Sequence, residues 1–335
     1  MTLPAQPWPT WPVYGLVDDV VPIMLQCSAA NEAFALATLV KVIGSSPRAI
    51  GSELLVSSRG EVYGYVSGGC VEAALAQEAS ECLFDHVPRM LVYGKGSPFV
   101  DIQLTCGGSI EILVRIVKPG AAWLHLLKAA RSARDSLEVT THLHTGEMDV
   151  SPRGWPRDAT FRQRYVPKTR LILVGNDPVT LATAMLASNM GMEVVLWRPN
   201  GPPDGPPLGV KTYLASGLYE GLERLEIDEF TAIYCLTHDL DLDVSILQRA
   251  LPSSAFCVGV LGSRSKREAR VQALISRNVS MHAISRLRSP AGLPIDARTP
   301  HEIALSILAE VTLLSRAEAY GCVEGANLDT LRVAV

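Results

Sequence analysis

Short apolar runs that end in a glycine or a polar turn recur through the second half of the chain, and this pattern strongly restricts the fold. The runs cover residues 170–175, 192–199, 231–238 and 256–263. Such runs are typical of strands buried on both faces of a sheet. The segment between the first two begins with Pro178 and ends with Gly191, as helices commonly do. This alternation predicts a parallel, doubly wound, Rossmann-like sheet.

The first half has a different pattern, in which strands follow one another more closely and predict a mixed α/β domain with an α+β-like arrangement. Strand patterns occupy residues 34–44, 52–58, 61–67, 89–94 and 109–117, and helical patterns occupy 17–32, 70–84 and 121–134. With 335 residues, 48% of them hydrophobic, the chain can bury more than one core. We expect an N-terminal domain over 1–144, a Pro- and Arg-rich linker or hairpin excursion over 145–168, and a C-terminal domain over 169–335.

Composition excludes several classes of protein. A formal net charge of −4 leaves no domain-wide basic surface for nucleic acid. No apolar run approaches the ~20 residues that span a bilayer, so no membrane association is expected. Residues 1–15 lack the basic and apolar regions of a signal peptide. The seven cysteines are scattered, without a Cys-x-x-Cys pair, so we expect no disulfide framework and a reducing cytoplasm.

Two cysteines each stand beside a pair of glycines. Cys70 follows Gly68-Gly69, and we expect it in the first turn of a helix, where the positive end of the helix favours the thiolate that ligates metals. Cys106 precedes Gly107-Gly108 at the start of a strand. The alternative interpretation is that each is a small residue required at a tight turn. Cys235 and Cys257 lie inside apolar runs and are expected to be buried.

The first turn of the Rossmann-like half begins at Gly175 but departs from the dinucleotide fingerprint. Asp177 stands where the second glycine of Gly-x-Gly-x-x-Gly would allow a pyrophosphate to approach. The next strand ends at Arg198 rather than at an acidic residue. NAD(P) binding in the usual mode is therefore disfavoured, because the carboxylate would repel the phosphates.

A second candidate for anion binding follows the last apolar run. Gly262-Ser263 precede a helix that opens with Arg264, Lys266 and Arg267, so backbone N–H groups and cations meet at one sheet edge. The alternative is a solvated basic helix face.

Two further stretches allow more than one interpretation. Thr299, Pro300 and Glu302 predict a capping box; Asp296 and Arg298 just before it either pair with each other or face the anion site. Residues 237–247 contain His238 and three aspartates, which indicate either a metal site or a helix N-cap at Asp241 or Asp243.

Several of these stretches together resemble the XdhC/CoxI family. The similarity lies in the segments GSSPRAIGSELLVSSRGEVYGYVSGGCVEAAL, TCGGSIEILV, THDLDLDVSIL, VGVLGSRSKREAR and GLPIDARTPHEIALSILAEV. It extends over about residues 15–320. The family's Rossmann turn is usually closer to Gly-x-Gly-x-x-x-x-Ala with an acidic strand end, so Asp177 and Arg198 are departures.

The resemblance implies a maturation factor that binds the molybdenum cofactor, protects it during sulfuration and delivers it to an apo molybdenum hydroxylase. A cysteine desulfurase is a further candidate partner, and family precedent suggests a homodimer. The residues implied to line or shape the pocket are Ser45, Pro47, Arg48, Ser67, Gly68, Gly69, Cys70, Glu72, Cys106, Gly107 and Gly108. Cys70 and Cys106 would supply thiolates to molybdenum. The phosphate end would be held by Arg48 or by the second half, where the candidates are Gly175, Gly262, Ser263, Arg264, Arg267 and Arg298.

Two other functions remain open from the residues alone. One is an NAD(P)-dependent oxidoreductase with Cys70 or Cys106 as the reactive residue, against which Asp177 counts. The other is a protein that only docks to a partner. We expect binding and hand-over rather than catalysis.

Overall fold

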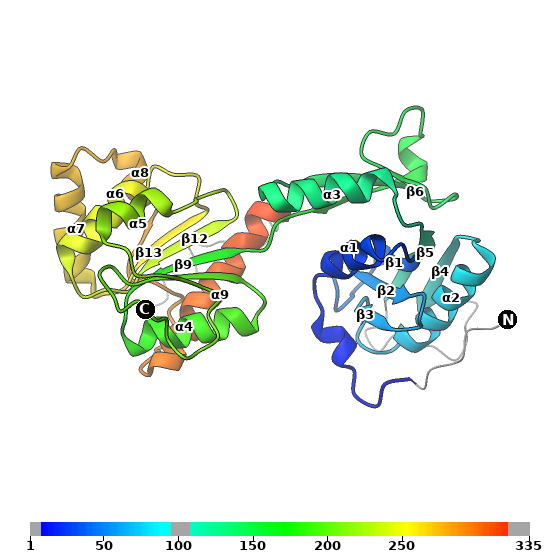
Figure 1. Cartoon of the computed structure of the whole chain (residues 1–335), viewed down its shortest axis with the longest axis horizontal. Helices are drawn as coiled ribbons and strands as arrows, with labels where there is room; N and C mark the ends of the chain where they lie inside the picture. Colours follow the sequence, from blue (N-terminus) through cyan, green and yellow to red (C-terminus); the bar gives the residue numbers. More distant parts are fainter. Residues whose placement is uncertain (1–7, 95–107, 321–335) are drawn as a thin grey trace. The chain divides into compact units, whose positions relative to one another are not determined.

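The computed structural model describes residues 8–94 and 108–320, except for the side chains of 264–265 and 316–320. The chain divides after Val166 into an N-terminal unit and a C-terminal unit (Figure 1), which are described separately.

The N-terminal unit is built on a five-stranded antiparallel sheet with the strand order β3-β2-β1-β5-β4. The strands are β1 (Phe34–Ile43), β2 (Glu53–Ser57), β3 (Val62–Gly64), β4 (Arg89–Gly94) and β5 (Ser109–Val117). A hairpin turn at Arg59-Gly60 joins β2 to β3, and Gly60 N–H donates there to Ser57 O at 2.9 Å.

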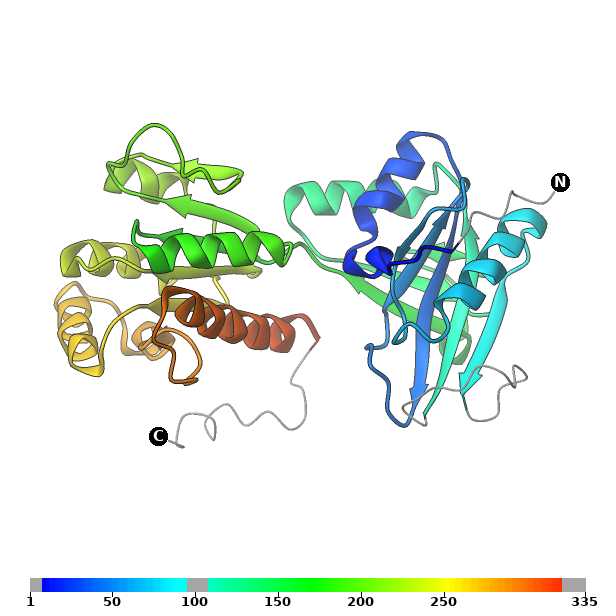
Figure 2. The same ribbon diagram turned by 90° about the horizontal axis from the view of Figure 1, so that it is seen from below.

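Helices cover both faces of this sheet (Figure 2). They are α1 (Val21–Ala29), α2 (Glu72–Asp85) and α3 (Ala122–Ala133), preceded by a 3₁₀ turn, η1 (Val13–Leu16). Side chains alternate along β1: Ala35 and Ala37 pack in the core that includes α2, whereas Phe34 and Leu36 pack in the core of α1 and α3. The sheet is therefore buried on both sides.

A smaller three-stranded sheet with the order β7-β6-β8 completes this unit. Its strands are β6 (Leu137–His142), β7 (Met148–Asp149) and β8 (Thr160–Tyr165), with η2 (Arg157–Ala159) before the last strand. The segment 145–168, expected as a linker or a hairpin excursion, thus contributes two strands that pair antiparallel with β6.

The C-terminal unit has the predicted doubly wound sheet. Six parallel strands follow the order β11-β10-β9-β12-β13-β14. They are β9 (Arg170–Val174), β10 (Glu193–Trp197), β11 (Thr212–Leu214), β12 (Thr231–Cys235), β13 (Cys257–Val260) and β14 (Leu287–Arg288). The order reverses between β9 and β12, where ligands of this fold usually bind.

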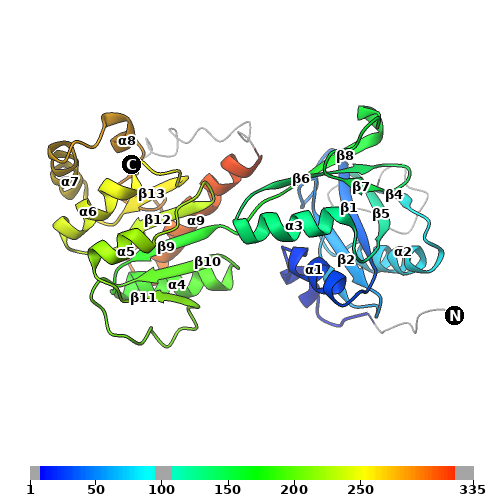
Figure 3. The same cartoon turned by 45° about the horizontal axis from the view of Figure 1, so that its top comes forward.

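Helices lie on both faces of the parallel sheet (Figure 3). They are α4 (Pro178–Asn189), α5 (Leu218–Arg224), α6 (Leu240–Ala250), α7 (Arg264–Ser276), α8 (Met281–Ser285) and α9 (Pro300–Tyr320). One core packs α4 and α9 against the sheet, and the other packs α6, α7 and α8. Within the described residues, no helix combines the length and apolarity required to cross a bilayer.

A polar network under β8 couples the two sheets of the N-terminal unit. Tyr165 OH donates to Glu53 Oε1 at 2.9 Å, and Thr38 Oγ1 donates to the same oxygen at 3.2 Å. The buried Arg115 donates in turn to Thr38 Oγ1 at 2.9 Å. Removal from water raises the pKa of the Glu53 carboxyl to about 7, although the positive charge of Arg115 opposes the shift.

This shift predicts that the N-terminal unit loses stability as the pH rises. Between about pH 4.5 and 7 the unfolded Glu53 carboxyl has released its proton while the folded one keeps it, so folding is penalised. The loss should be at most about 3 kcal/mol and complete above pH 7. Urea unfolding followed by tryptophan fluorescence should show a shallower pH dependence in Glu53→Gln. Glu81→Gln, at an exposed position, serves as control. If the free energy of unfolding changes equally with pH in Glu53→Gln and in wild type, Glu53 does not have the raised pKa.

Candidate functional site

One edge of the antiparallel sheet collects the segments that the sequence singled out in the first half. β1 ends there at Ile43, which pairs with Ser109 at the beginning of β5. β3 also ends at this edge, because Gly64 pairs with Leu54 near the beginning of β2. Antiparallel pairing therefore brings the loop after β1, the loop after β3 and the chain before β5 to the same side.

Glycines allow these loops to touch. A Cβ on Gly108 would lie 2.4 Å from Ser45 O and 2.9 Å from Ile43 O, so no side chain fits there. A Cβ on Gly68 would lie 3.5 Å from Pro47 Cγ. Ser45, Pro47, Gly68 and Gly108 thus lie in one cluster. Cys106 and Gly107 directly precede Gly108 but lie outside the described residues.

The carboxylate of Glu72 holds the loop that carries Cys70. Glu72 is fully buried and accepts hydrogen bonds from Ser67 N (2.7 Å), Ser67 Oγ (2.8 and 2.9 Å), Val71 N (3.2 Å) and Val66 N (3.3 Å). α2 begins at Glu72 itself, so this residue stands at the helix start and at the end of the loop. Its oxygens face its own loop, so Glu72 is a positioning residue.

Cys70 is exposed, but it does not lie in the first turn of a helix. α2 begins at Glu72 with Val71 as its N-cap, so the predicted helix start was two residues too early. The reason is the inward turn of Glu72, which fastens the preceding residues in a non-helical loop. Gly69, at φ +93°, has no atom within 4 Å of a Cβ position, so the approach to Cys70 is open. Among the other described cysteines, Cys235 and Cys257 are buried as predicted.

Arg48 brings a cation to the same cluster. Its guanidinium carbon lies 5.3 Å from the centre of the Tyr65 ring, and Nη1 lies 3.2 Å from Asp18 Oδ1. Its Nε is buried and has no hydrogen-bond partner in the part of the chain that the structure describes. A buried N–H donor of this kind lowers stability unless an acceptor forms a hydrogen bond with it. The position therefore suits an anionic or polar ligand.

The first turn of the Rossmann unit is closed by its own side chains. Asp177 is the N-cap of α4 and accepts from Thr180 N at 2.8 Å and from Thr180 Oγ1 at 2.6 Å. Pro178 at the first helical position has no N–H to offer. A Cβ on Gly175 would lie 2.5 Å from Thr180 Oγ1, so this glycine serves packing. The carboxylate thus caps the N-terminus of α4, the place where this fold usually binds a dinucleotide phosphate.

The remaining candidates of the second half lie near α7 and α9. Ser263 is the N-cap of α7, Arg267 is exposed, and the side chain of Arg264 is outside the described set. Arg298 is 79% exposed and pairs with Asp296 at 2.8 Å, which is one of the two alternatives expected. The predicted capping box is confirmed: Thr299 N donates to Glu302 Oε2 at 2.9 Å, and Glu302 N to Thr299 Oγ1 at 3.3 Å.

Two of the three aspartates of 237–247 have structural roles. Asp239, rather than Asp241 or Asp243, is the N-cap of α6. Asp243 is fully buried and accepts from Arg270 Nε (3.0 Å) and Nη2 (2.7 Å). The described residues contain no group of three His, Cys, Asp or Glu side chains placed to hold a metal ion. The metal interpretation of this loop is therefore wrong, because it overlooked Arg270, 27 residues further along the chain.

Together these features define a two-unit α/β protein with an exposed thiol in a glycine-lined loop of one unit and a self-capped Rossmann turn in the other. Comparison with known proteins also divides the chain into two parts. Residues 27–94 match the sequence pattern of the XdhC and CoxI family, and residues 171–311 match the XdhC Rossmann domain. The chain belongs to the XdhC and CoxI family.

Individual relatives extend over nearly the whole chain. A protein named molybdenum cofactor insertion chaperone PaoD, from Escherichia coli K12, is 30% identical over 302 residues, which cover 88% of this chain and 89% of that protein. A relative from Bacillus subtilis 168, named as a probable xanthine dehydrogenase component, is 29% identical, covering 84% and 93%. A crystal structure described as a xanthine dehydrogenase from Bacillus halodurans superposes with a TM-score of 0.75 at 25% identity, covering 93% and 99%.

The role of Glu72 in holding the loop can be tested by measuring the free energy of unfolding of variants. Glu72→Ala would leave Ser67 and the neighbouring N–H groups buried without an acceptor, which should cost about 2–4 kcal/mol of unfolding free energy. Glu81→Ala, on the same helix but with its side chain 52% exposed, should stay within about 0.5 kcal/mol of wild type. Urea denaturation of both variants tests this, and equal stabilities would show that Glu72 does not hold the loop.

Proposed function

We propose that this chain is an accessory protein that binds the molybdenum cofactor, protects it during sulfuration and delivers it to an apo molybdenum hydroxylase. The observation that carries the proposal is the convergence of Ser45, Pro47, Gly68 and Gly108 beside the exposed Cys70 at one sheet edge. It occurs in a chain that is 30% identical to a protein named as a molybdenum cofactor insertion chaperone.

The residues of this cluster fit such a cargo. The thiol of Cys70, once deprotonated, offers a soft sulfur ligand of the kind that suits a transition metal. Arg48 offers the buried, unpartnered Nε to an oxygen or phosphate of the ligand. Gly68 and Gly69 leave backbone groups uncovered, and from the family resemblance we propose that Cys106 and Gly107 also take part in binding. The metal chemistry itself belongs to the client enzyme that receives the cofactor.

Binding and hand-over require no catalytic step by this chain, so we propose a carrier rather than an enzyme. Its partners would be a molybdenum hydroxylase of the xanthine dehydrogenase type and, as sulfur donor to the cofactor, a cysteine desulfurase. We also propose a homodimer in the cytoplasm. An NAD(P)-dependent oxidoreductase is not favoured, because Asp177 caps α4 where the pyrophosphate would bind.

Anaerobic binding of released molybdenum cofactor, read by pterin fluorescence and metal content, tests the proposal. Wild type should bind it stoichiometrically. Cys70→Ala and Cys106→Ala should weaken binding more than Cys257→Ala, since Cys257 is buried in β13 of the other unit. No binding by folded wild type would contradict the carrier function, and nicotinamide nucleotides would then be titrated. Unimpaired transfer to a client by the cysteine variants would favour docking alone.

Two arginines of the same unit provide a matched comparison. Arg48→Ala should weaken cofactor binding by ten- to a hundredfold, roughly the value of one charge-assisted hydrogen bond. Arg59→Ala removes the same charge from a hairpin where Arg59 pairs with Glu32 at 2.7 Å, and it should leave affinity unchanged. Equal losses in both variants would indicate a general charge effect and remove Arg48 from the site.

A further inference from the structure

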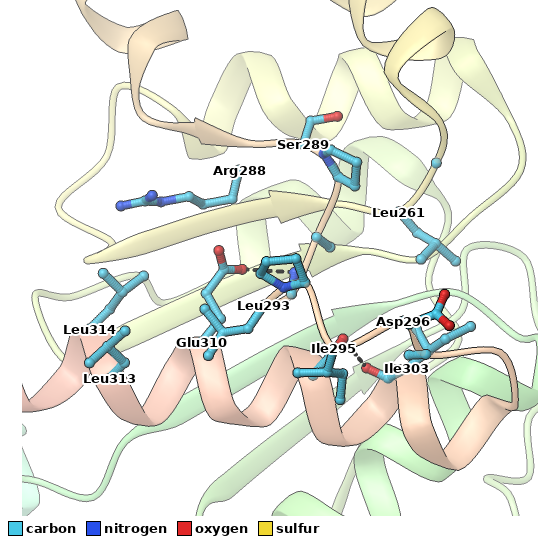
Figure 4. A pocket seen from close by; sticks show the side chains of 17 residues that line it. Leu261, Arg288, Ser289, Leu293, Ile295, Asp296, Ile303, Glu310, Leu313 and Leu314 are labelled. Carbon is cyan, nitrogen blue, oxygen red and sulfur yellow. Dashed lines mark hydrogen bonds between the residues drawn. The ribbon is translucent and has the colours of Figure 1, made fainter. Parts of the chain in front are cut away.

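A pocket of about 630 Å³ opens within the C-terminal unit (Figure 4), and Gly175 is not among its lining residues. Its walls come from three segments: the end of β13 with Leu261 and Gly262, the chain from Arg288 to Ala297, and one face of α9 from Ile303 to Leu314. This volume is in the range that holds a small-molecule ligand, and the lining is mostly aliphatic with a few polar groups, as in such sites.

A buried polar group in the lining is the carboxyl of Glu310, which is 4% exposed; the side chain of Arg288 also lines the pocket. Its Oε2 accepts from Gly292 N at 3.0 Å, the contact drawn in Figure 4, and from Tyr234 OH at 2.8 Å. A carboxylate has about four acceptor positions, which suits a ring that carries N–H groups. Proline and leucine side chains around it, from Pro290, Leu293 and Pro294, offer apolar surface to the faces of such a ring.

The opposite end of the pocket is lined by the chain just before α7. Gly262 lines the pocket, and the 13-residue helix starts two residues later at Arg264. The N-terminus of a helix presents unsatisfied N–H groups and attracts anions. Arg267 stands exposed in its first turn.

A second observation, independent of the helix, points to an anion here. Arg270 is 2% exposed; Nε and Nη2 bond to Asp243, and Nη2 also donates to Leu261 O at 3.0 Å. Its Nη1 is buried without a hydrogen-bond partner among the described residues. That nitrogen lies 2.9 Å from the position of a Cβ on Gly262. An unsatisfied cationic donor therefore lies beside Gly262, two residues before the helix begins.

We propose that this pocket binds a phosphorylated heteroaromatic compound of mononucleotide size. The phosphate lies at Gly262-Ser263 and the first turn of α7, and the ring lies between the 290–295 chain and α9, with N–H donors toward Glu310.

The two ends are close enough for one such ligand. Ala291 N donates to Val260 O at 3.1 Å, which places the chain beside Glu310 next to the end of β13. Gly262 is two residues beyond Val260, roughly 7 Å along an extended chain. The carboxylate of Asp296, which also lines the pocket, is offset by its ion pair with Arg298.

A free nucleotide and the nucleotide end of a nucleotide-bearing cofactor share this chemistry. The inference rests on the proposed function only if the ligand is the second of these. The site differs from the usual dinucleotide site of the fold, because it lies at the ends of β13 and β14 rather than at the reversal between β9 and β12.

Isothermal titration calorimetry of the full chain with AMP, GMP, CMP and UMP tests the proposal, with the parent nucleosides and inorganic phosphate as further probes. At least one monophosphate should bind with one-to-one stoichiometry and at least tenfold more tightly than its nucleoside. Ile295→Glu, which adds a negative charge at the pocket, should weaken that binding at least tenfold. Ile275→Glu, at an isoleucine of α7 with similar exposure (41% against 48%) outside the pocket, should leave it unchanged.

Absence of binding by all four nucleotides up to about 1 mM would overturn the proposal. So would equal losses in the two isoleucine variants, or inorganic phosphate binding as tightly as any nucleotide. If stoichiometric molybdenum cofactor displaces the nucleotide, the pocket holds the end of that cofactor; if both bind together, it holds a free nucleotide. Either result supports the pocket. Nucleotide binding by a chain that fails to bind the cofactor would contradict the proposed function and leave this inference intact.

Discussion

The buried carboxylate of Glu72 determines the form of the loop that carries the exposed thiol. By accepting from Val66, Ser67 and Val71, it turns the chain between β3 and α2 back on itself and leaves Gly68, Gly69 and Cys70 at the surface. Without these donors, burying the carboxylate would cost much more free energy of folding. The exposed thiol is thus presented by a loop that a buried side chain, two residues further along, holds in place.

The two units use opposite solutions for placing polar groups at a sheet edge. In the antiparallel sheet, neighbouring strands end and begin at the same side, so segments distant in sequence, such as Ser45 and Gly108, meet through backbone contact. In the parallel sheet, every strand ends at the same edge, and capping residues decide which helix N-termini stay open. Asp177 closes the beginning of α4, whereas the Ser263 side chain makes no capping hydrogen bond at the beginning of α7.

Local patterns predicted much of this architecture. The apolar runs of the second half indicated the parallel strands, Pro178 marked the beginning of α4, and Thr299 with Glu302 indicated a capping box, because each depends on residues within one turn or one strand. The ion pair of Asp243 with Arg270 and the contact of Glu310 with Gly292 join residues 27 and 18 positions apart. No spacing rule connects them. Cys70 was assigned to a helix for the same reason, since only the fold shows that Glu72 points inward.

Alkylation of Cys70 by iodoacetamide, followed by mass spectrometry, tests the central claim that this loop holds the cargo. Cys70 is exposed, whereas Cys27, Cys82, Cys235 and Cys257 are buried and serve as slow internal references. Under anaerobic conditions, stoichiometric molybdenum cofactor should slow modification of Cys70 at least tenfold without affecting the buried thiols. An unchanged rate at Cys70 in a chain that demonstrably carries the cofactor would place the cargo elsewhere and contradict the account.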